Sequence, residues 1–493
     1  MINSKRPEVI NNPLVLSGLF IGMCIVVAIT YPELFSTKLP KLIHNLLRLF
    51  GSFYLYLGLA SVLVLLCIAF SKVGKIKLGN SKPRYSWLSW ISMLYSTGMG
   101  AGLLLRAVQE PVYYFSHSPR ESALSKSDFA LQYTFFHWGL TPWAFYGLFG
   151  LIIAYNIYGQ KKTILSSASL GSRYTNTLWS GIIDAVTIIC TLLGVVAAAG
   201  LGSRQLLGAY QYWAGLQDLP ASSSVYIMLI IGILATLSAF LGLNKGIRKI
   251  SNLNIFLAVA LMLFTWMVSG AGGNVLLSVV SAGSHYLREF LPMSLNLGKQ
   301  QVSQAFLIDW TFFYWAFWLS WAPFTGVFIA RISKGRTIRQ FIFGALLVPA
   351  LGTFLWFGIF GNSVFGLLEA GTAEATQFES IYSAIFNFFN HLPLAWLSNS
   401  IATVLIFTFL ITSVDSAIYV LSMFSDKGNT KPSKKMRLYW GSIISLSTIL
   451  VILLGKDQLL AAVSQLLILF ALPFSFLFVG LVGIFLYSIF KKK

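Results

Sequence analysis

The sequence predicts an all-α integral membrane protein with twelve transmembrane helices. Of its 493 residues 56% are hydrophobic and only 10% are charged, which is too apolar for a soluble protein with one core. A helix that spans a membrane needs about 20 apolar residues. Twelve stretches qualify, near residues 13–31, 50–71, 86–116, 129–158, 177–212, 223–243, 252–271, 303–330, 338–366, 396–424, 437–455 and 458–490. No low-complexity linker separates them, so we expect no additional soluble domain.

The third and eighth spans carry residues that interrupt helices at matching places. Glycine occupies alternate positions over residues 98–102, followed by Pro111, and the eighth span contains Pro323 and Gly326. Each glycine destabilises a helix by about 1 kcal/mol relative to alanine, and proline removes a backbone donor. Matched interruptions predict an inverted repeat of five and five helices, preceded by two extra helices. Glycines that only allow close helix packing are the alternative.

Aromatic residues run through the middle of the fourth and eighth spans. In the eighth span Trp310, Phe313, Tyr314, Phe317, Trp318 and Trp321 recur at helical spacing and mark one face. The fourth span adds Trp138, Trp143 and Tyr146. Lipid-facing helices keep tryptophan near the two interfaces, so we expect an internal box of rings. Such ring faces bind a cation, above all a quaternary ammonium; a bulky packing seam is the alternative.

The tenth span supplies the adjacent hydroxyls of Thr412 and Ser413. Together with carbonyls freed in the broken third span, they would form an all-oxygen site suited to Na⁺. The alternative is that each hydroxyl bonds back to the carbonyl four residues earlier. Asp415 and Glu110, near span ends or kinks, are predicted to be structural anchors or gate pairs rather than proton carriers.

The distribution of basic residues predicts that both termini are cytoplasmic. With the N-terminus inside, 25 Lys and Arg residues fall in inner loops and eight in outer loops. This bias is an orientation signal, so the net charge of +20 does not indicate nucleic-acid binding. Arg106 and Arg204 lie inside spans, where an arginine costs at least ~2.5 kcal/mol. Each should face a partner or an aqueous cavity, unless it snorkels to the outer interface.

The predicted spans and repeats divide the chain into four parts. An N-terminal pair of helices (1–85) precedes the first repeat (86–271), and a second repeat with a short basic tail (303–493) ends the chain. Between them, residues 272–302 contain a moderately apolar stretch with amphipathic spacing. We expect it to lie along the extracellular face as an interfacial helix.

These motifs resemble the betaine/carnitine/choline transporter (BCCT) family. The similarity extends over roughly residues 10–490 and is densest in residues 310–361; HWGLTPWAFY, TGMGAGLLLRAVQEP and TSVDS add to it in the right order. The resemblance implies a twelve-helix, LeuT-like protein with the inverted repeat, commonly a homotrimer. It also implies uptake or exchange of trimethylammonium compounds such as betaine, choline and carnitine.

The resemblance further implies roles for individual residues. Trp138, Trp143 and Tyr146 match the family's aromatic-box positions on the fourth span, and Trp315, Phe317, Trp318 and Trp321 match the aromatic run on the eighth. Thr97, Met99, Phe409, Thr412 and Ser413 match the sodium site of the sodium-coupled members.

Three departures from the family pattern concern the substrate and the coupling ion. Phe317 stands where a tryptophan is usual, which weakens the cation–π face. Arg106 replaces an aromatic residue beside the broken helix, and the fifth span has lost most hydroxyls of a second sodium site while gaining Arg204. At most one Na⁺ is expected. Either guanidinium could replace a bound cation, or Arg106 could hold the carboxylate or sulfonate of a zwitterion.

The sequence therefore predicts a secondary active transporter of the plasma membrane that works by alternating access. Its cargo would be a betaine-, choline- or carnitine-type solute, coupled to an ion gradient or exchanged; a sulfonate, ectoine or an amino acid is the alternative cargo. No Walker-type loop, HExxH motif or Ser/His/Asp spacing occurs, so neither ATP-driven transport nor an enzyme is expected. A channel or sensor would not need matched interruptions. Besides Na⁺, no cofactor is expected.

Overall fold

The computed structural model describes residues 12–491 apart from 32, 34–37, 99, 172–173, 175–176, 217–218, 243, 271–273 and 456–458. Within these residues the regular elements are helices. Their bounds are α1 Pro13–Thr30, α2 Leu39–Phe70, α3 Trp87–Gly98, α4 Gly102–Arg106, α5 Gln109–Ser116, α6 Lys126–Trp138, α7 Leu140–Ala154, α8 Leu178–Ala214, α9 Ser224–Leu241, α10 Asn244–Val268, α11 Asn274–Leu295, α12 Gln304–Phe306, α13 Phe313–Ile332, α14 Ile338–Ile342, α15 Val348–Glu369, α16 Ala384–Asn390, α17 Ala395–Ser425, α18 Lys434–Gly455 and α19 Leu459–Lys491.

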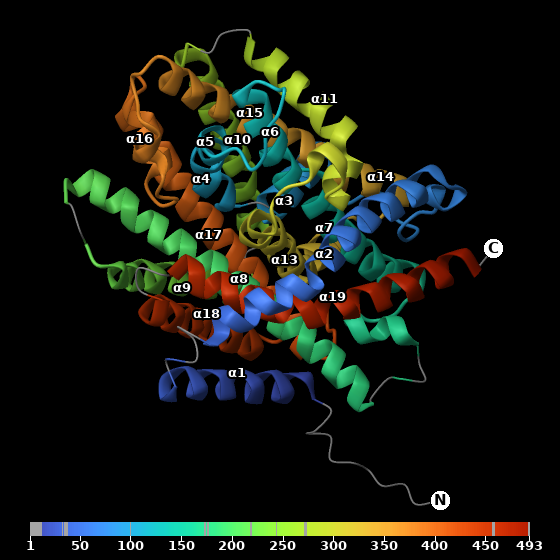
Figure 1. The fold of residues 1–493 in the computed structure, drawn as a ribbon. Coiled ribbons are helices and arrows are strands. Elements are labelled where there is room, and N and C mark those ends of the chain that lie inside the picture. Colours follow the sequence, from blue (N-terminus) through green and yellow to red (C-terminus); the bar gives the residue numbers. More distant parts are fainter. Residues whose placement is uncertain are drawn as a thin grey trace, which may run out of the picture.

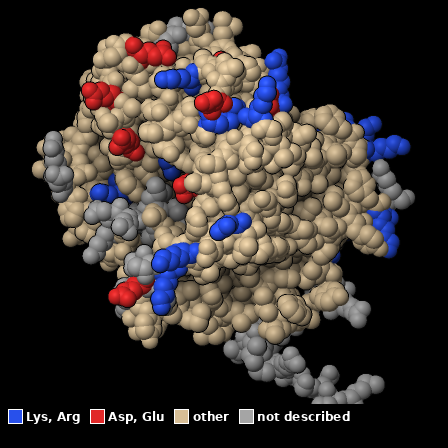
Figure 2. Space-filling model, viewed as in Figure 1, with Lys and Arg blue, Asp and Glu red and all other residues tan. Residues whose placement is uncertain are grey.

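Ten spans of the described chain are long and apolar enough to cross a membrane. The all-helical membrane fold is therefore confirmed, whereas the count of twelve stays a prediction. Apart from the ten, α1 contains a shorter apolar segment, Pro13–Cys24, and the predicted third span is divided among α3, α4 and α5. On the face drawn in Figure 2, charged side chains form isolated groups among otherwise uncharged residues.

Helices α7 and α13 lie near the centre of the molecule, and α1, α9 and α18 lie at its periphery (Figure 1). Helix α13 packs along α7 and also contacts α8 and α19. Helix α11 runs along one end of the molecule against α6 and α15. One face of α11 is buried, including Val279 and Tyr286, while Leu277 and Val280 on the other are exposed. Its place at a membrane interface stays a prediction.

Local sequence explains where several of these helices begin and end. The side chain of Ser125 accepts a hydrogen bond from the backbone of Asp128 at the start of α6, and Thr177 does the same for Ser180 at the start of α8. Such caps satisfy backbone donors that have no partner in the first turn. Helix α8 ends at Gly215, which adopts the left-handed conformation that glycine tolerates best.

The predicted interruption of the third span is confirmed. Helix α3 ends at Gly98, α4 begins at Gly102, and Gly100 between them has a φ of 48°. Side chains disfavour this left-handed region, which explains the glycine. A Cβ atom at Gly98 would lie 2.5 Å from the ring of Trp143, so close packing requires glycine there as well.

The predicted interruption of the eighth span at Pro323 is wrong. Helix α13 continues through Pro323, and the irregular part of this span is a π-helical segment at Leu307–Phe312. A proline removes only one backbone donor, and packing against α7 holds the helix together. Gly326 serves this packing: a Cβ atom there would lie 2.8 Å from the backbone nitrogen of Gly150. The alternative reading of these glycines as close-packing residues is therefore correct for α13.

An interruption that the sequence did not lead us to expect divides the fourth span at Gly139. Helix α6 ends at Trp138 and α7 begins at Leu140, because Gly139 leaves the helical region with φ −92° and ψ −122°. The backbone nitrogen of Leu140 donates to the hydroxyl of Tyr286 on α11 at 3.2 Å. Pro142, which cannot donate a backbone hydrogen bond, is the signal that could have revealed this break.

Candidate functional site

A cavity of about 60 Å³ lies between α4, α6, α8, α13 and α17. Its lining includes eight of the side chains singled out from the sequence: Arg106, Trp138, Phe313, Tyr314, Phe317, Trp318, Trp321 and Ser413. Gln205 and Phe324 are among its other larger side chains. The broken third span and the aromatic stripe of α13 therefore meet at one enclosed space.

The aromatic rings of the cavity pack against one another at fixed angles. The Tyr314 and Trp318 rings stack with centroids 5.6 Å apart, and the Trp138 ring meets Trp318 edge to face at 5.0 Å. Phe317 stacks on Trp321 at 5.9 Å. Both arrangements are favourable ring geometries. They hold several π-systems around one space, as a cation-binding box requires.

The indole N–H groups of the three lining tryptophans are already occupied by protein acceptors. Trp138 Nε1 donates to Glu110 Oε2 at 2.8 Å, and Trp318 Nε1 donates to the backbone oxygen of His137 at 3.0 Å. Trp321 Nε1 donates to the backbone oxygen of Gly194 at 2.9 Å. These rings therefore offer a ligand their π-systems rather than their hydrogen-bond donors.

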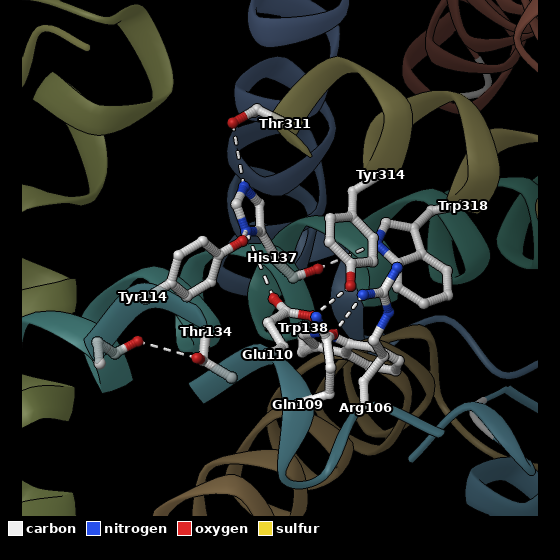
Figure 3. Close-up of polar contacts among 11 residues, drawn as sticks. Arg106, Gln109, Glu110, Tyr114, Thr134, His137, Trp138, Thr311, Tyr314 and Trp318 are labelled. Atoms are coloured by element: carbon white, nitrogen blue, oxygen red, sulfur yellow. Dashed lines mark hydrogen bonds and ion pairs between the residues drawn. The ribbon is translucent and has the colours of Figure 1, made fainter. Parts of the chain in front are cut away.

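A buried network around Glu110 holds part of this wall in place (Figure 3). The Glu110 side chain is fully buried and accepts hydrogen bonds from the Tyr314 hydroxyl and from Trp138. His137 Nδ1 lies 3.6 Å from Glu110 Oε1 and hydrogen-bonds to the Tyr114 hydroxyl at 2.8 Å. Figure 3 shows these groups converging from α5, α6 and α13. Glu110 thus has the geometry of an anchor for two cavity rings.

Asp415 occupies a different and simpler position. It is buried on α17 and accepts a hydrogen bond from the hydroxyl of Ser238 on α9 at 2.9 Å. This contact joins two helices and, as for Glu110, has the geometry expected of a structural anchor.

Arg106 lies at the boundary between the cavity and a wider outer pocket. Its side chain is 9% exposed, and Nη1 donates to Gln109 Oε1 at 2.5 Å. Its guanidinium carbon lies 5.5 Å from the centre of the Trp310 ring. Among the described residues no carboxylate forms an ion pair with it. Arg106 is therefore a nearly buried cation with a ring and a neutral amide as neighbours, but without a counter-ion.

The outer pocket has a volume of about 680 Å³, and Arg106 and Trp310 line it as well. Its walls also carry Asp309 and Glu379. We call it the vestibule. A solute that reaches the cavity from this side would pass Arg106.

Trp143 and Tyr146 lie behind the cavity wall rather than in its lining. The Trp143 ring stacks on Tyr95 at 5.8 Å and meets Tyr146 edge to face at 5.7 Å, while Tyr146 lies 6.3 Å from Trp318. Trp315 lies farther away: its ring packs on Phe136 at 5.1 Å and is not part of the lining. The structure thus brings Trp143 and Tyr146 near the site, but not Trp315.

Arg204 is also outside the cavity lining. It is half-buried in the C-terminal part of α8, ten residues before the helix ends, and its guanidinium carbon lies 5.6 Å from the centre of the Tyr382 ring. Burial raises the pKa of Tyr382 to about 12, so this phenol is neutral near pH 7 and meets the arginine as a ring face. Arg204 therefore has an aromatic partner of its own.

The residues expected to bind an ion are only partly described. Met99 and the side chain of Thr97 lie outside the described residues. Phe409, Thr412 and Ser413 are buried on α17. The Thr412 hydroxyl donates to the backbone oxygens of Thr408 at 3.0 Å and Phe409 at 3.1 Å, as in the alternative reading of this motif. Its lone pairs remain available to a cation.

Sequence reasoning missed two residues of this region. His137 directly precedes Trp138, and a histidine inside an apolar span was a signal that we did not use. Gln205 on α8 lines the cavity, but a single glutamine in a small-residue helix gives no sequence signal.

Comparison with known proteins agrees with this geometry. A family model described as "BCCT, betaine/carnitine/choline family transporter" matches residues 13–493. The glycine betaine transporter OpuD of Bacillus subtilis is 38% identical over 454 residues, covering 90% of this chain and 87% of that protein. The ectoine/hydroxyectoine transporter of Virgibacillus pantothenticus is 34% identical and covers 94% of both chains. The betaine/ectoine transporter LcoP of Corynebacterium glutamicum is 33% identical, over 86% of this chain and 68% of that protein.

Two solved structures share the fold at low sequence identity. MhsT in complex with L-phenylalanine has a TM-score of 0.52 at 13% identity, covering 81% of this chain and 90% of that chain. A Na⁺-coupled sialic acid symporter in a substrate-bound outward-open state has a TM-score of 0.50 at 12% identity, covering 86% of each chain. The likeness shows the LeuT-like fold.

Proposed function

Because this chain belongs to the betaine/carnitine/choline transporter family, we propose that it carries a small zwitterion, with a cationic head and a carboxylate, by alternating access. It is a multi-pass membrane transporter of quaternary-ammonium-type solutes, as its relatives are. The finer statement rests on one observation: a cavity combines aromatic rings with an arginine that has no counter-ion among the described residues.

The rings of Trp138, Tyr314, Phe317, Trp318 and Trp321 would surround the cationic head. Each good cation–π contact is worth about 0.5–2 kcal/mol, with the larger values where water is excluded. The protein already satisfies the indole donors of this lining, so a trimethylammonium group, which cannot accept hydrogen bonds, leaves none of them unpaired. Trp143 and Tyr146, behind the wall, would fix the positions of these rings.

Arg106 would receive the carboxylate at the vestibule end of the cavity. Its Nη1 is bound to Gln109, but the other guanidinium donors have no hydrogen bond to a described residue. A carboxylate there would supply the counter-ion that the described chain does not, through a charge-assisted hydrogen bond. Choline, which has no acid group, would lack this contact.

Coupling would use at most one Na⁺, held by carbonyls of the broken third span together with Thr97, Met99, Phe409, Thr412 and Ser413. Support comes from the break itself and from the depth of Thr412 and Ser413 on α17, beside the cavity. Exchange without sodium is the alternative, in which the guanidinium of Arg106 or Arg204 replaces the ion. Arg204 contacts the ring of Tyr382 and does not line the cavity, whereas Arg106 does. Arg106 is therefore the better candidate for a role at the substrate.

We place the protein in the plasma membrane with both termini cytoplasmic, because inner loops are richer in basic residues. Residues 86–271 and 303–493 would be the two inverted repeats, with α11 between them lying along the outer face. A homotrimer is the expected assembly, as the family resemblance implies.

A ligand screen tests the substrate and the coupling ion together. Purified protein is melted with glycine betaine, choline, carnitine, taurine or ectoine, each with and without Na⁺. We expect the carboxylate zwitterions to raise the melting temperature more than choline does, with an added shift in Na⁺ if sodium is coupled. Saturable counterflow in liposomes separates a transporter from a channel. Stabilisation by choline alone would contradict the role of Arg106.

A further inference from the structure

Gln205 is a buried amide in the cavity wall that has no hydrogen-bond partner. Its side chain is fully buried, and neither Nε2 nor Oε1 forms a hydrogen bond within the described residues. An unpaired buried polar group costs about 1–3 kcal/mol. Gln205 nevertheless belongs to the residues that line the cavity, so a turn of this side chain would bring its donor and its acceptor to a molecule bound there.

The other polar groups of the lining cannot replace this amide. The Tyr314 hydroxyl and the three indole N–H groups already donate to protein acceptors. Arg106 has donors but no acceptor. Around Gln205 the wall is formed by small or aliphatic residues such as Gly202 and Leu410. Among the lining side chains that the structure describes, the hydroxyl oxygens of Tyr314 and Ser413 and the amide of Gln205 can accept a hydrogen bond from a ligand, and Gln205 is the one that carries its donor and its acceptor on two separate atoms.

Arg106 and Gln205 lie on helices that contact each other. Arg106 ends α4, Gln205 lies on α8, and the two helices pack together while lining the same cavity. The aromatic stripe of α13 forms another wall. A zwitterion held by its cationic group among the rings of α13 would therefore turn its acid end toward α4 and α8.

We propose that Gln205 selects zwitterions that carry an N–H group next to the carboxylate. Its Nε2 donates to the carboxylate, beside Arg106, and its Oε1 accepts from the adjacent N–H. This inference rests on the proposed function and deepens it, because it defines the substrate class. Ectoine fits this class, with a ring N–H beside the carbon that bears its carboxylate. A fully methylated betaine has no N–H group, so its carboxylate can accept from Nε2 but nothing donates to Oε1.

A cycle of two proteins and two ligands tests this role. The ligands are ectoine and ectoine methylated at the ring nitrogen beside the carboxylate-bearing carbon, which keeps the charge but removes the N–H. The proteins, in proteoliposomes, are wild type and Gln205→Met, whose side chain has similar size but no amide. We expect methylation to weaken inhibition of uptake by at least about tenfold in wild type, the lower end for a hydrogen bond that involves a charged group, and less than threefold in the variant.

Gln132→Met is the matched control. Gln132 is another fully buried amide without a partner among the described residues, but it lies on α6 outside the cavity lining. It should keep the wild-type ratio between the two ligands, even if its stability changes. If the two variants change the ratio between the two ligands by the same amount, Gln205 has no role in selection.

Each outcome has a distinct meaning. If wild type binds both ligands equally well, the inference about Gln205 is wrong. This comparison uses the wild-type protein alone, so it does not depend on whether a variant folds. If methylation weakens binding tenfold in both proteins, another residue reads the N–H, and the inference is again wrong. If wild type binds and transports no carboxylate zwitterion at all, glycine betaine included, the proposed function itself fails.

Discussion

Arg106 is the residue whose surroundings depart most from those of a structural arginine. It is nearly buried, stacks near Trp310, and has no ion-pair partner among the described side chains. Other arginines have clear structural tasks: Arg336 lies over the rings of Trp87 and Trp90, at 4.2 and 4.0 Å. Because a buried charge is expensive unless it is compensated, these surroundings support the proposal that Arg106 binds the acid group of the substrate.

Replacing Arg106 with leucine should weaken glycine betaine binding by about ten- to a hundredfold, the range of one charge-assisted hydrogen bond. Choline binding should change less than threefold, because choline has no carboxylate. Titration of both ligands in a thermal-shift or uptake assay measures the two affinities. Arg204→Leu is the control and should leave both unchanged. Equal loss for both ligands would mean that Arg106 supports the fold rather than the substrate.

Arg106→Trp addresses the alternative in which the guanidinium replaces an ion. If transport of the zwitterion is lost and no sodium dependence arises, Arg106 acts on the substrate. If uptake instead becomes dependent on Na⁺, the guanidinium acts as a cation substitute. A variant that keeps full, sodium-independent uptake would exclude both roles.

Trp315 and Trp318 form a matched pair for testing the aromatic box. They lie three residues apart on α13, but Trp318 lines the cavity whereas Trp315 packs on Phe136. Trp318→Leu should weaken binding of glycine betaine about tenfold, consistent with losing a desolvated cation–π contact. Trp315→Leu should lower the melting temperature, because Trp315 packs in the core. Its affinity for glycine betaine should change by less than about threefold. The reverse pattern would show that the ligand lies elsewhere.

At the scale of elements, the crossing of α7 and α13 sets the position of the whole aromatic stripe. Gly326 and Gly150 face each other there without side chains. The crossing explains why α13 stays continuous at Pro323 and why its rings reach the interruption at Gly139. The element-level errors of sequence reasoning were to place a break at Pro323 and to miss the break at Gly139.

Gly326→Ala should therefore destabilise the protein. The added Cβ atom would lie 2.8 Å from the backbone nitrogen of Gly150 and 3.1 Å from the Tyr146 oxygen, so the helices must separate. Overpacking of this kind typically costs about 1–3 kcal/mol, measured as a lower melting temperature. Gly366→Ala on α15 is the control: nothing lies within 4 Å of its Cβ, so stability should be unchanged or slightly higher. If both variants melt alike, the crossing is not tight.

At the scale of the whole molecule, the proposed orientation in the membrane rests on the distribution of basic residues among the loops. In a variant without Cys24, Cys67 and Cys190, cysteines placed at the exposed positions Thr372 and Asn429 report opposite sides. Thr372→Cys should react with an impermeant maleimide on intact cells, and Asn429→Cys only after the membrane is opened. Labelling of Asn429→Cys on intact cells would reverse the proposed orientation.

The sequence by itself determined the membrane class, most of the spans, the break at Gly98–Gly102 and the aromatic character of the site. These features are local: hydrophobicity, helical spacing and glycine preference are read within one stretch of chain. Residues at the cavity such as Arg106, Trp138, Trp318 and Trp321 were named on this basis.

Only the tertiary structure decided which of these side chains share a space. The family resemblance implied a site role for both Trp315 and Trp318, although only Trp318 lies on the stripe that helical spacing marks. In the structure they contact different neighbours, because α13 packs between α7, α8 and α19. Residues distant along the chain decide whether a buried polar group has a partner. They satisfy the indole donors, and among the described residues they leave the amide of Gln205 without a hydrogen bond and Arg106 without a counter-ion. Whether a buried polar group is paired is a property of packing, and packing is what a single stretch of sequence does not contain.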